Sequence, residues 1–223
     1  MEHPKLLAEG PEDANRTLVL AHGAGGPMDS PFLNAVAAGV ASNGVRVVRF
    51  EFPYMQARRQ RGGRSAPDRE PVLRESWLAV IGRLGGAERL VIGGKSLGGR
   101  IASLIADEAG VEGLVCLGYP FHPPGNPDRL RTRHLATLRT PTLIVQGTRD
   151  PFGPREEVPG YSLSPKIRIV WIEDGDHSLK PRARSGRTEK QNLEEAILAT
   201  CEFLENLVRV RPRISSAEER NQT

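Results

Sequence analysis

The sequence is poor in cysteine, in aromatic residues and in long apolar runs. Its 223 residues include two cysteines, Cys116 and Cys201, and aromatic residues make up 5% of the chain. Cysteines so few and so far apart are typical of buried free thiols, which argues against a disulfide-stabilised secreted domain and favours a reducing compartment. No apolar run approaches the roughly 18 residues of a membrane span, and residues 1–16 show no apolar signal segment. We therefore expect a cytoplasmic protein with no membrane contact.

The charge of the chain is too small to predict a nucleic-acid partner. Lys and Arg number 31 and Asp and Glu number 27, so the formal net charge is +4. The length suits one α/β domain with a well-buried core, and 24 glycines with 18 prolines imply many turns. On its charge, the chain is therefore not expected to bind nucleic acid.

Short apolar runs alternate with helical patterns along the chain. Strands are predicted over residues 17–23, 45–53, 89–94, 113–120, within 141–150, and over 166–174. Helices are predicted over residues 28–44, 71–84, 97–107 and 189–208, and residues 56–70 resemble a long polar loop. This alternation predicts an α/β fold, a three-layer α/β/α sandwich around a mostly parallel sheet.

The alternation runs through residues 17–208 with no sign of a second domain. We therefore divide the chain into an N-terminal segment of residues 1–16, a domain of residues 17–208 and a polar tail of residues 209–223. Parallel sheets place their binding sites beyond the carboxyl ends of the strands. The loops that follow the predicted strands are therefore where functional residues are expected.

The stretch GGKSLGGR, which runs from Gly93 to Arg100, fits two interpretations. It could end a phosphate-binding P-loop, Gly-x-x-x-x-Gly-Lys-Ser, or form the Gly-x-Ser-x-Gly turn that presents a nucleophilic serine. A P-loop would need a glycine at position 89, where the sequence has Arg89. The serine turn fits, because it lies between a predicted strand and a predicted helix. We therefore predict Ser96 as nucleophile and the N–H of Leu97 as an oxyanion donor.

A nucleophilic serine needs a base, and the base needs an orienting acid. In a strand–turn–helix setting these partners follow in the order Ser, acid, His. Three histidines follow Ser96, namely His122, His134 and His177. His177 comes directly after the last predicted strand and is the candidate base. His122 precedes the candidate acid, and His134 lies in a polar stretch.

The candidate acid is Asp150, which follows a predicted strand and precedes Pro151. An ordinary Asp-Pro turn is the simpler interpretation of this pair. Asp174 and Asp176 flank the candidate histidine at a spacing that disfavours contact with its ring, and Asp128 is a more distant alternative. Asp150 has the expected position at a strand end.

A second oxyanion donor is expected in the loop after the first predicted strand. That loop reads HGAGG, from His22 to Gly26, and the N–H of Ala24 is the predicted donor with Gly25 as the alternative. A glycine-rich turn without chemistry would look the same. His22 is expected to support the loop and not to act as a base.

Taken together, GKSLGGR, QGTRDPFG and DGDHSLK resemble motifs of the α/β-hydrolase family. The similarity covers about residues 15 to 208 and is greatest to small lidless members like the dienelactone hydrolases, and within them to the testis-expressed-protein-type hydrolase-like subgroup. It implies Ser96, Asp150 and His177 as a catalytic triad, with Ala24 and Leu97 as oxyanion donors. The chain departs from the full fold in one respect, because its two leading antiparallel strands have little room before Thr17 and the sheet is expected to be trimmed. The short segment from Phe121 to Thr140 leaves no space for a large cap. Dienelactone hydrolases carry a cysteine nucleophile, so their substrate is not carried over.

These residues predict a serine hydrolase that cleaves a carboxylic ester or thioester and needs no metal or organic cofactor. The alternative is a non-catalytic hydrolase-like module that binds a protein partner. Basic residues follow three predicted strands and fit either an anion-attracting rim or ordinary solvated loop charge. They are Arg58, Arg59, Arg61, Arg64, Arg129, Arg131, Arg133, Lys180, Arg182, Arg184 and Arg187.

Overall fold

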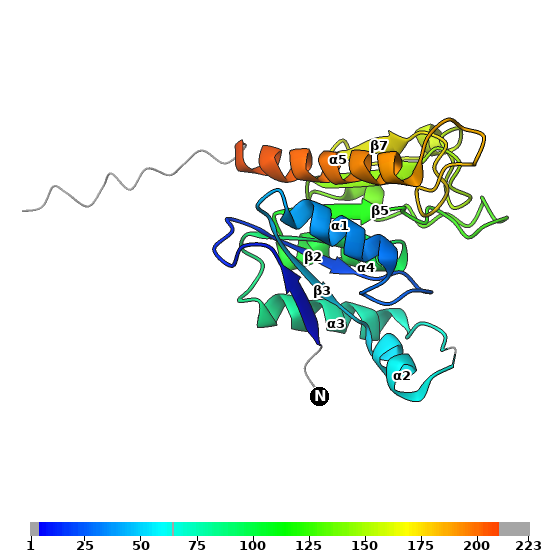
Figure 1. Cartoon of the computed structure of the whole chain (residues 1–223). Coiled ribbons are helices and arrows are strands. Elements are labelled where there is room, and N and C mark those ends of the chain that lie inside the picture. Colours follow the sequence, from blue (N-terminus) through cyan, green and yellow to red (C-terminus); the bar gives the residue numbers. More distant parts are fainter. Residues whose placement is uncertain (1–4, 64, 210–223) are drawn as a thin grey trace, which may run out of the picture.

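The computed structural model describes residues 5–63 and 65–209, which form one sheet with helices on both faces (Figure 1). Its strands are β1 Leu6–Glu9, β2 Thr17–Ala21, β3 Arg46–Phe50, β4 Leu90–Lys95, β5 Gly113–Leu117, β6 Thr142–Gly147 and β7 Ile167–Ile172. Its α-helices are α1 Pro31–Ala41, α2 Pro53–Arg61, α3 Glu70–Arg83, α4 Leu97–Ala109 and α5 Glu189–Arg209. The strand order is β1-β3-β2-β4-β5-β6-β7, and only β1 is antiparallel to its neighbour. The predicted α/β/α sandwich is confirmed.

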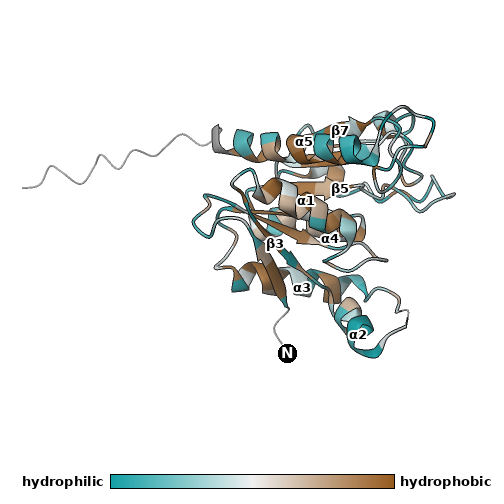
Figure 2. Cartoon of the chain, viewed as in Figure 1, coloured by the Kyte–Doolittle hydropathy of each residue, from teal (hydrophilic) through white to brown (hydrophobic). Residues whose placement is uncertain are grey.

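Each face of the sheet has its own hydrophobic core because side chains alternate along every strand. Leu18 and Leu20 of β2 pack with α1 and α5, which lie side by side on one face (Figure 1). Val19 and Ala21 point the other way and pack with α3 and α4. Figure 2 shows hydrophobic strands between helices whose outer parts are hydrophilic. None of the helices in the described ranges is both long and apolar enough to cross a membrane.

Both cysteines are buried and free, as the sequence predicts. Cys116 lies in β5 against one core, and Cys201 lies in α5 against the other. Burial raises the pKa of both thiols, so neither is poised as a thiolate. Leu73 and Trp77 of α3 are also buried. These residues therefore have packing roles.

Two elements differ from the prediction. β1 is only four residues long and lies in the segment set apart as N-terminal, yet it extends the sheet by pairing with β3. Helix α2 occupies residues 56–61 of the predicted loop 56–70, so the prediction is wrong there and holds for residues 62–63 and 65–69. Its two buried residues, Tyr54 and Met55, are adjacent in the sequence and so give no helical periodicity. The signals that could have predicted this helix are Pro53 at its start and Gly62 after its end. Apart from Arg209, the predicted polar tail lies outside the described residues.

The strand order creates a crevice between β2 and β4. The chain leaves β2 through α1 to reach β3 on one side, then passes back through α2 and α3 to β4 on the other side. The loops that follow β2 and β4 therefore diverge to opposite faces of the sheet. Such a switch point is the usual position of a ligand site in an open α/β sheet.

We predict that Trp77→Ala lowers the free energy of unfolding by about 3–5 kcal/mol. Trp77 is fully buried, and its ring packs edge-to-face on Phe50 with 4.7 Å between centroids. Urea unfolding would measure the loss. Leu78→Ala is the matched control on the same helix, because Leu78 is 41% exposed and should lose less than about 1 kcal/mol. Equal losses in both variants would contradict the packing face of α3.

Candidate active site

The turn between β4 and α4 presents Ser96 at the end of a strand. Ser96 has a φ of 50°, a conformation that costs energy for a residue with a side chain, and its backbone N–H donates to the carbonyl of Leu117 at 3.1 Å. A Cβ atom at Gly94 would lie 2.1 Å from the carbonyl oxygen of Ala21, and one at Gly98 would lie 2.4 Å from it. The two glycines are therefore needed so that the turn can pack against β2.

The predicted serine, histidine and aspartate lie in one hydrogen-bonded line. The Oγ atom of Ser96 is 2.8 Å from Nε2 of His177, and Nδ1 of His177 is 2.8 Å from Oδ2 of Asp150. Because a carboxylate can only accept a hydrogen bond, the ring proton lies on Nδ1, and Nε2 is left free to accept the serine proton. The three side chains come from loops after β4, β6 and β7, separated by up to 81 positions in the sequence.

Asp150 is fully buried and is held by two further donors. The amide Nε2 of Gln146 lies 2.9 Å from Oδ2, and the backbone N–H of Phe152 lies 2.9 Å from Oδ1. The ring of Phe152 packs on the imidazole of His177 with 4.2 Å between centroids. The orientation of the acid and of the imidazole is therefore fixed from several sides. Sequence analysis missed Gln146 and Phe152, although both lie within the quoted QGTRDPFG motif.

Lys95 also contacts the histidine, a role that the sequence analysis did not predict. Its Nζ atom donates to the backbone carbonyl of His177 and lies 5.6 Å from the centroid of the Phe32 ring. Burial lowers the pKa of Lys95 to about 8, although the charges of Asp150 and Asp176 oppose the shift. Lys95 thereby ties the loop that carries the imidazole to the strand that carries Ser96.

The other candidate residues have partners away from Ser96. His122 bonds Glu157 at 3.1 Å, and His134 bonds Ser103 at 2.8 Å. Burial lowers the pKa of His134 to about 4, which keeps its ring neutral near pH 7. Asp174 is paired with Arg182, whose hydrogen bond lowers the pKa of that carboxyl to about 2.

The two remaining acids are also accounted for. Asp176 accepts the backbone N–H groups of Ser178 and Lys180 and so shapes the histidine loop. Asp128 is exposed. Among the histidines and acids considered from the sequence, His177 and Asp150 are therefore the ones that the structure brings to Ser96.

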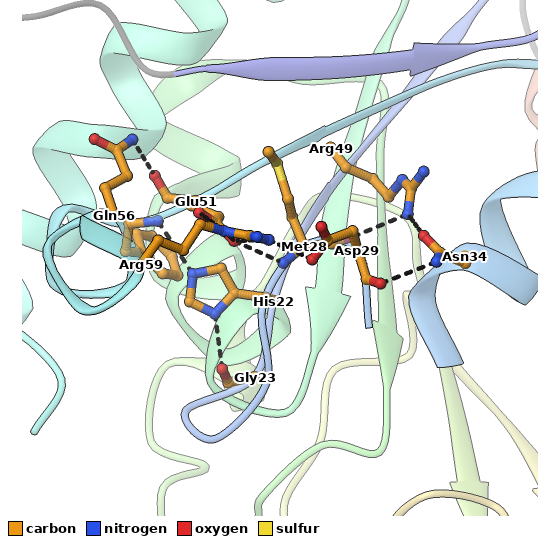
Figure 3. Close-up of polar contacts among 10 residues, drawn as sticks. His22, Gly23, Met28, Asp29, Asn34, Arg49, Glu51, Gln56 and Arg59 are labelled. Carbon is orange, nitrogen blue, oxygen red and sulfur yellow. Dashed lines mark hydrogen bonds and ion pairs between the residues drawn. The ribbon is translucent and has the colours of Figure 1, made fainter. Parts of the chain in front are cut away.

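The loop after β2 lies on the other side of Ser96. A Cβ atom at Gly23 would lie 3.8 Å from Cβ of Ser96, so the start of this loop touches the serine turn. The Nε2 atom of His22 accepts the N–H of Phe52 at 3.1 Å, which leaves the proton on Nδ1 to be donated to the Gly23 carbonyl at 2.7 Å (Figure 3). Burial lowers the pKa of His22 and favours this neutral form. His22 therefore supports the loop, as predicted.

The fold agrees with the comparison to known families. Residues 14–205 match the family described as an alpha/beta hydrolase domain. The chain belongs to the α/β-hydrolase family.

Solved α/β hydrolases share this fold at low sequence identity. An α/β serine hydrolase homologue from Coxiella burnetii is 20% identical with a TM-score of 0.62, over 92% of this chain and 89% of that one. A lidless α/β serine hydrolase from Xanthomonas campestris is 18% identical with a TM-score of 0.62, over 92% and 87% of the two chains. A thermophilic esterase from Thermogutta terrifontis is 17% identical with a TM-score of 0.64, over 92% and 93%.

The α/β hydrolase described here has an open cleft of about 390 Å³ beside Ser96. The cleft is lined by the loop of residues 23–26, the first turn of α1, Lys95, Phe152 and His177. Residues 118–141 between β5 and β6 contain only a short 3-10 turn, at Leu135–Thr137, so no cap domain covers this cleft. In the described ranges, no cluster of three or more His, Cys, Asp or Glu side chains is arranged to hold a metal ion.

Four described residues of the predicted basic rim of this hydrolase form ion pairs. Arg59 pairs with Asp29 and Glu51, and Arg182 pairs with Asp174. Lys180 and Arg187 pair with two acids of α5. Arg64 lies outside the described residues. Among the described residues, Lys95 is the one Lys or Arg that lines the cleft itself.

The lowered pKa of Lys95 predicts a pH-dependent stability. Between the folded pKa of about 8 and the unfolded value of 10.5, the unfolded chain binds more protons, so the free energy of unfolding rises with pH. Lys95→Met removes this rise, which amounts to at most about 3 kcal/mol across the window. Urea unfolding of both proteins from pH 7 to 10.5 would measure the difference. Lys190→Met is the control, because Lys190 is exposed and its loss should leave the rise intact. If the free energy of unfolding of Lys95→Met rises with pH as much as that of the wild type, the prediction is contradicted.

Proposed function

We propose that this α/β hydrolase is a serine hydrolase that cleaves a carboxylic ester or thioester through an acyl-enzyme on Ser96. The observation that carries the proposal is the unbroken line of two 2.8 Å contacts from Ser96 through His177 to Asp150. Similarity to an esterase and to serine hydrolases supports the reaction class. The strained backbone of Ser96 supports a role as nucleophile, because such strain is concentrated at functional sites.

In the proposed mechanism, Nε2 of His177 takes the proton of Ser96 as its Oγ attacks the acyl carbon. Asp150 holds the ring in the required tautomer and stabilises the imidazolium. The N–H groups of Leu97 and Ala24 then stabilise the oxyanion, and His177 returns its proton to the leaving alcohol or thiol. Water, activated by the same imidazole, attacks the acyl-enzyme and releases Ser96.

The position of both proposed oxyanion donors supports this mechanism. Leu97 is the first residue of α4, where backbone N–H groups are left without helical partners. Ala24 lies in the wall of the cleft, and its N–H has no hydrogen-bond partner among the described residues. Each such donor is worth about 100- to 1000-fold in rate. The two buried free cysteines support the further proposal of a cytoplasmic location.

We predict that Ser96→Ala abolishes hydrolysis of short-chain p-nitrophenyl esters and labelling by a fluorophosphonate probe. Asp150→Asn should lower kcat by about 1000- to 10,000-fold, because the new amide can donate to Nδ1 and hold the imidazole in the wrong tautomer. The exposed Asp128→Asn is the matched control and should retain full activity. A wild-type protein that neither hydrolyses a panel of esters and thioesters nor takes up the probe would instead support the non-catalytic interaction module.

We further propose that the small acyl substrate is anionic. Lys95 and the amino-terminal end of α1 both face the cleft and contribute positive potential there. A hemisuccinate ester should then be hydrolysed with a lower KM than the uncharged butyrate ester of the same alcohol. Raising the NaCl concentration should raise the KM of the hemisuccinate alone, since salt in the open cleft screens the attraction between its carboxylate and this potential. Equal KM values with the same salt response would contradict an anionic substrate.

A further inference from the structure

The loop that carries Ala24 is held from behind by helix α2 and the end of β3. The Tyr54 hydroxyl lies 3.3 Å from the carbonyl of Gly23 and 3.2 Å from that of Ala24. Arg58, one turn further along α2, donates to the carbonyl of Gly25 at 3.3 Å. Three consecutive carbonyls therefore face the helix that the sequence analysis did not predict.

The orientation of these carbonyls decides the direction of the neighbouring N–H groups. In a planar trans peptide, the C=O of one residue and the N–H of the next point in opposite directions. A Gly23 carbonyl drawn toward α2 thus turns the N–H of Ala24 away from α2, and the Ala24 carbonyl does the same for the N–H of Gly25. Both residues line the cleft, and neither N–H has a hydrogen-bond partner among the described residues.

Tyr54 is itself held in place. It is only 4% exposed, and its backbone N–H donates to Oδ2 of Asp68 at 2.8 Å, which ties down the first turn of α2. Its ring lies 5.5 Å from that of His22. Burial raises the pKa of the Tyr54 phenol, so the hydroxyl keeps its proton and remains a donor across the working pH range.

A second set of contacts fixes the far end of the same loop (Figure 3). The buried carboxylate of Glu51 accepts the N–H of Met28 at 3.1 Å and both of its oxygens lie 2.8 Å from Nε of Arg59. Arg49 donates to the carbonyl of Met28 at 2.9 Å. The backbone N–H and carbonyl of Met28 are thus both hydrogen-bonded, which anchors the end of the loop. The Tyr54 contacts therefore act on a short segment that is held at its far end.

We propose that Tyr54 is a positioning residue of the oxyanion hole, whose hydroxyl, together with the His22 Nδ1 that donates to the same Gly23 carbonyl at 2.7 Å, orients the peptide that presents the N–H of Ala24 to the cleft. The inference rests on the proposed function, because only an acyl-transfer reaction makes use of that N–H. Tyr54 touches no reacting atom and acts through the Gly23 and Ala24 carbonyls. Arg58 has a weaker role, because the Gly25 carbonyl sets the N–H of the more distant Gly26.

Tyr54→Phe is the test, because it removes the hydroxyl and keeps the buried ring. We expect kcat to fall by about 3- to 10-fold with KM unchanged, as expected for a contact that matters in the transition state. Affinity for a boronic acid that forms a tetrahedral adduct should fall by the same factor, while affinity for the carboxylate product should not change. Arg58→Gln should cause a smaller loss than Tyr54→Phe.

Tyr161→Phe is the matched control, because its hydroxyl donates to Glu157 at 3.1 Å outside the cleft. Tyr161→Phe should leave kcat unchanged. A fall in kcat that occurs only in Tyr54→Phe is then caused by the position of the lost hydroxyl and not by the loss of a tyrosine hydroxyl in general. The free energy of unfolding of both variants should fall by a similar amount.

The amide signals of Ala24 and Gly25 in ¹H–¹⁵N NMR spectra provide a readout that needs no catalysis. They should shift in Tyr54→Phe and stay in place in Tyr161→Phe. If the wild-type protein hydrolyses nothing while these signals shift, the proposed function fails and the orienting contact stands. Unmoved Ala24 and Gly25 signals, or a kcat equal to that of an active wild type, would overturn the role assigned to Tyr54.

Discussion

The parallel pairing of β2 with β4 is the constraint on which the site depends. It places the carbonyl of Ala21 so close to the serine turn that Gly94 and Gly98 cannot carry side chains. Because the strand order reverses at this pair, the loop after β2 and the turn after β4 face each other across one crevice. The cleft beside Ser96 is a direct consequence of this topology.

The polar groups around the crevice are held by neighbours from several elements. Asp150 receives hydrogen bonds from Gln146, Phe152 and His177, and the carbonyl of His177 receives one from Lys95. Each contact satisfies a polar group that burial would otherwise leave unpaired, and each restricts one degree of freedom of the site. Such preorganisation is the basis of electrostatic catalysis, because the dipoles do not have to reorient as charge develops.

Helix α2 shows why a weakly patterned segment can matter for a site. Its arginine-rich sequence gives almost no apolar periodicity, so it resembled a loop. In the fold it brings Tyr54, Arg58 and Arg59 against the loop of residues 23–29. Two arginines that were candidates for an anion-attracting rim instead bind groups of the protein itself. Arg58 donates to the carbonyl of Gly25, and Arg59 pairs with Asp29 and Glu51. Charge counted along a sequence is therefore a poor guide to free charge at a site.

The sequence by itself determined the strand–helix alternation and the serine turn, because both depend on local rules. Apolar runs predict buried strands, and a strained turn needs glycine two residues before and after Ser96. The order of Asp150 and His177 after strand ends was readable for the same reason. Tertiary structure decided the pairing of β1, the formation of α2 and the contacts of Lys95 and Tyr54. Lys95 and His177 are 82 positions apart, and only the packed sheet brings such groups within hydrogen-bonding distance.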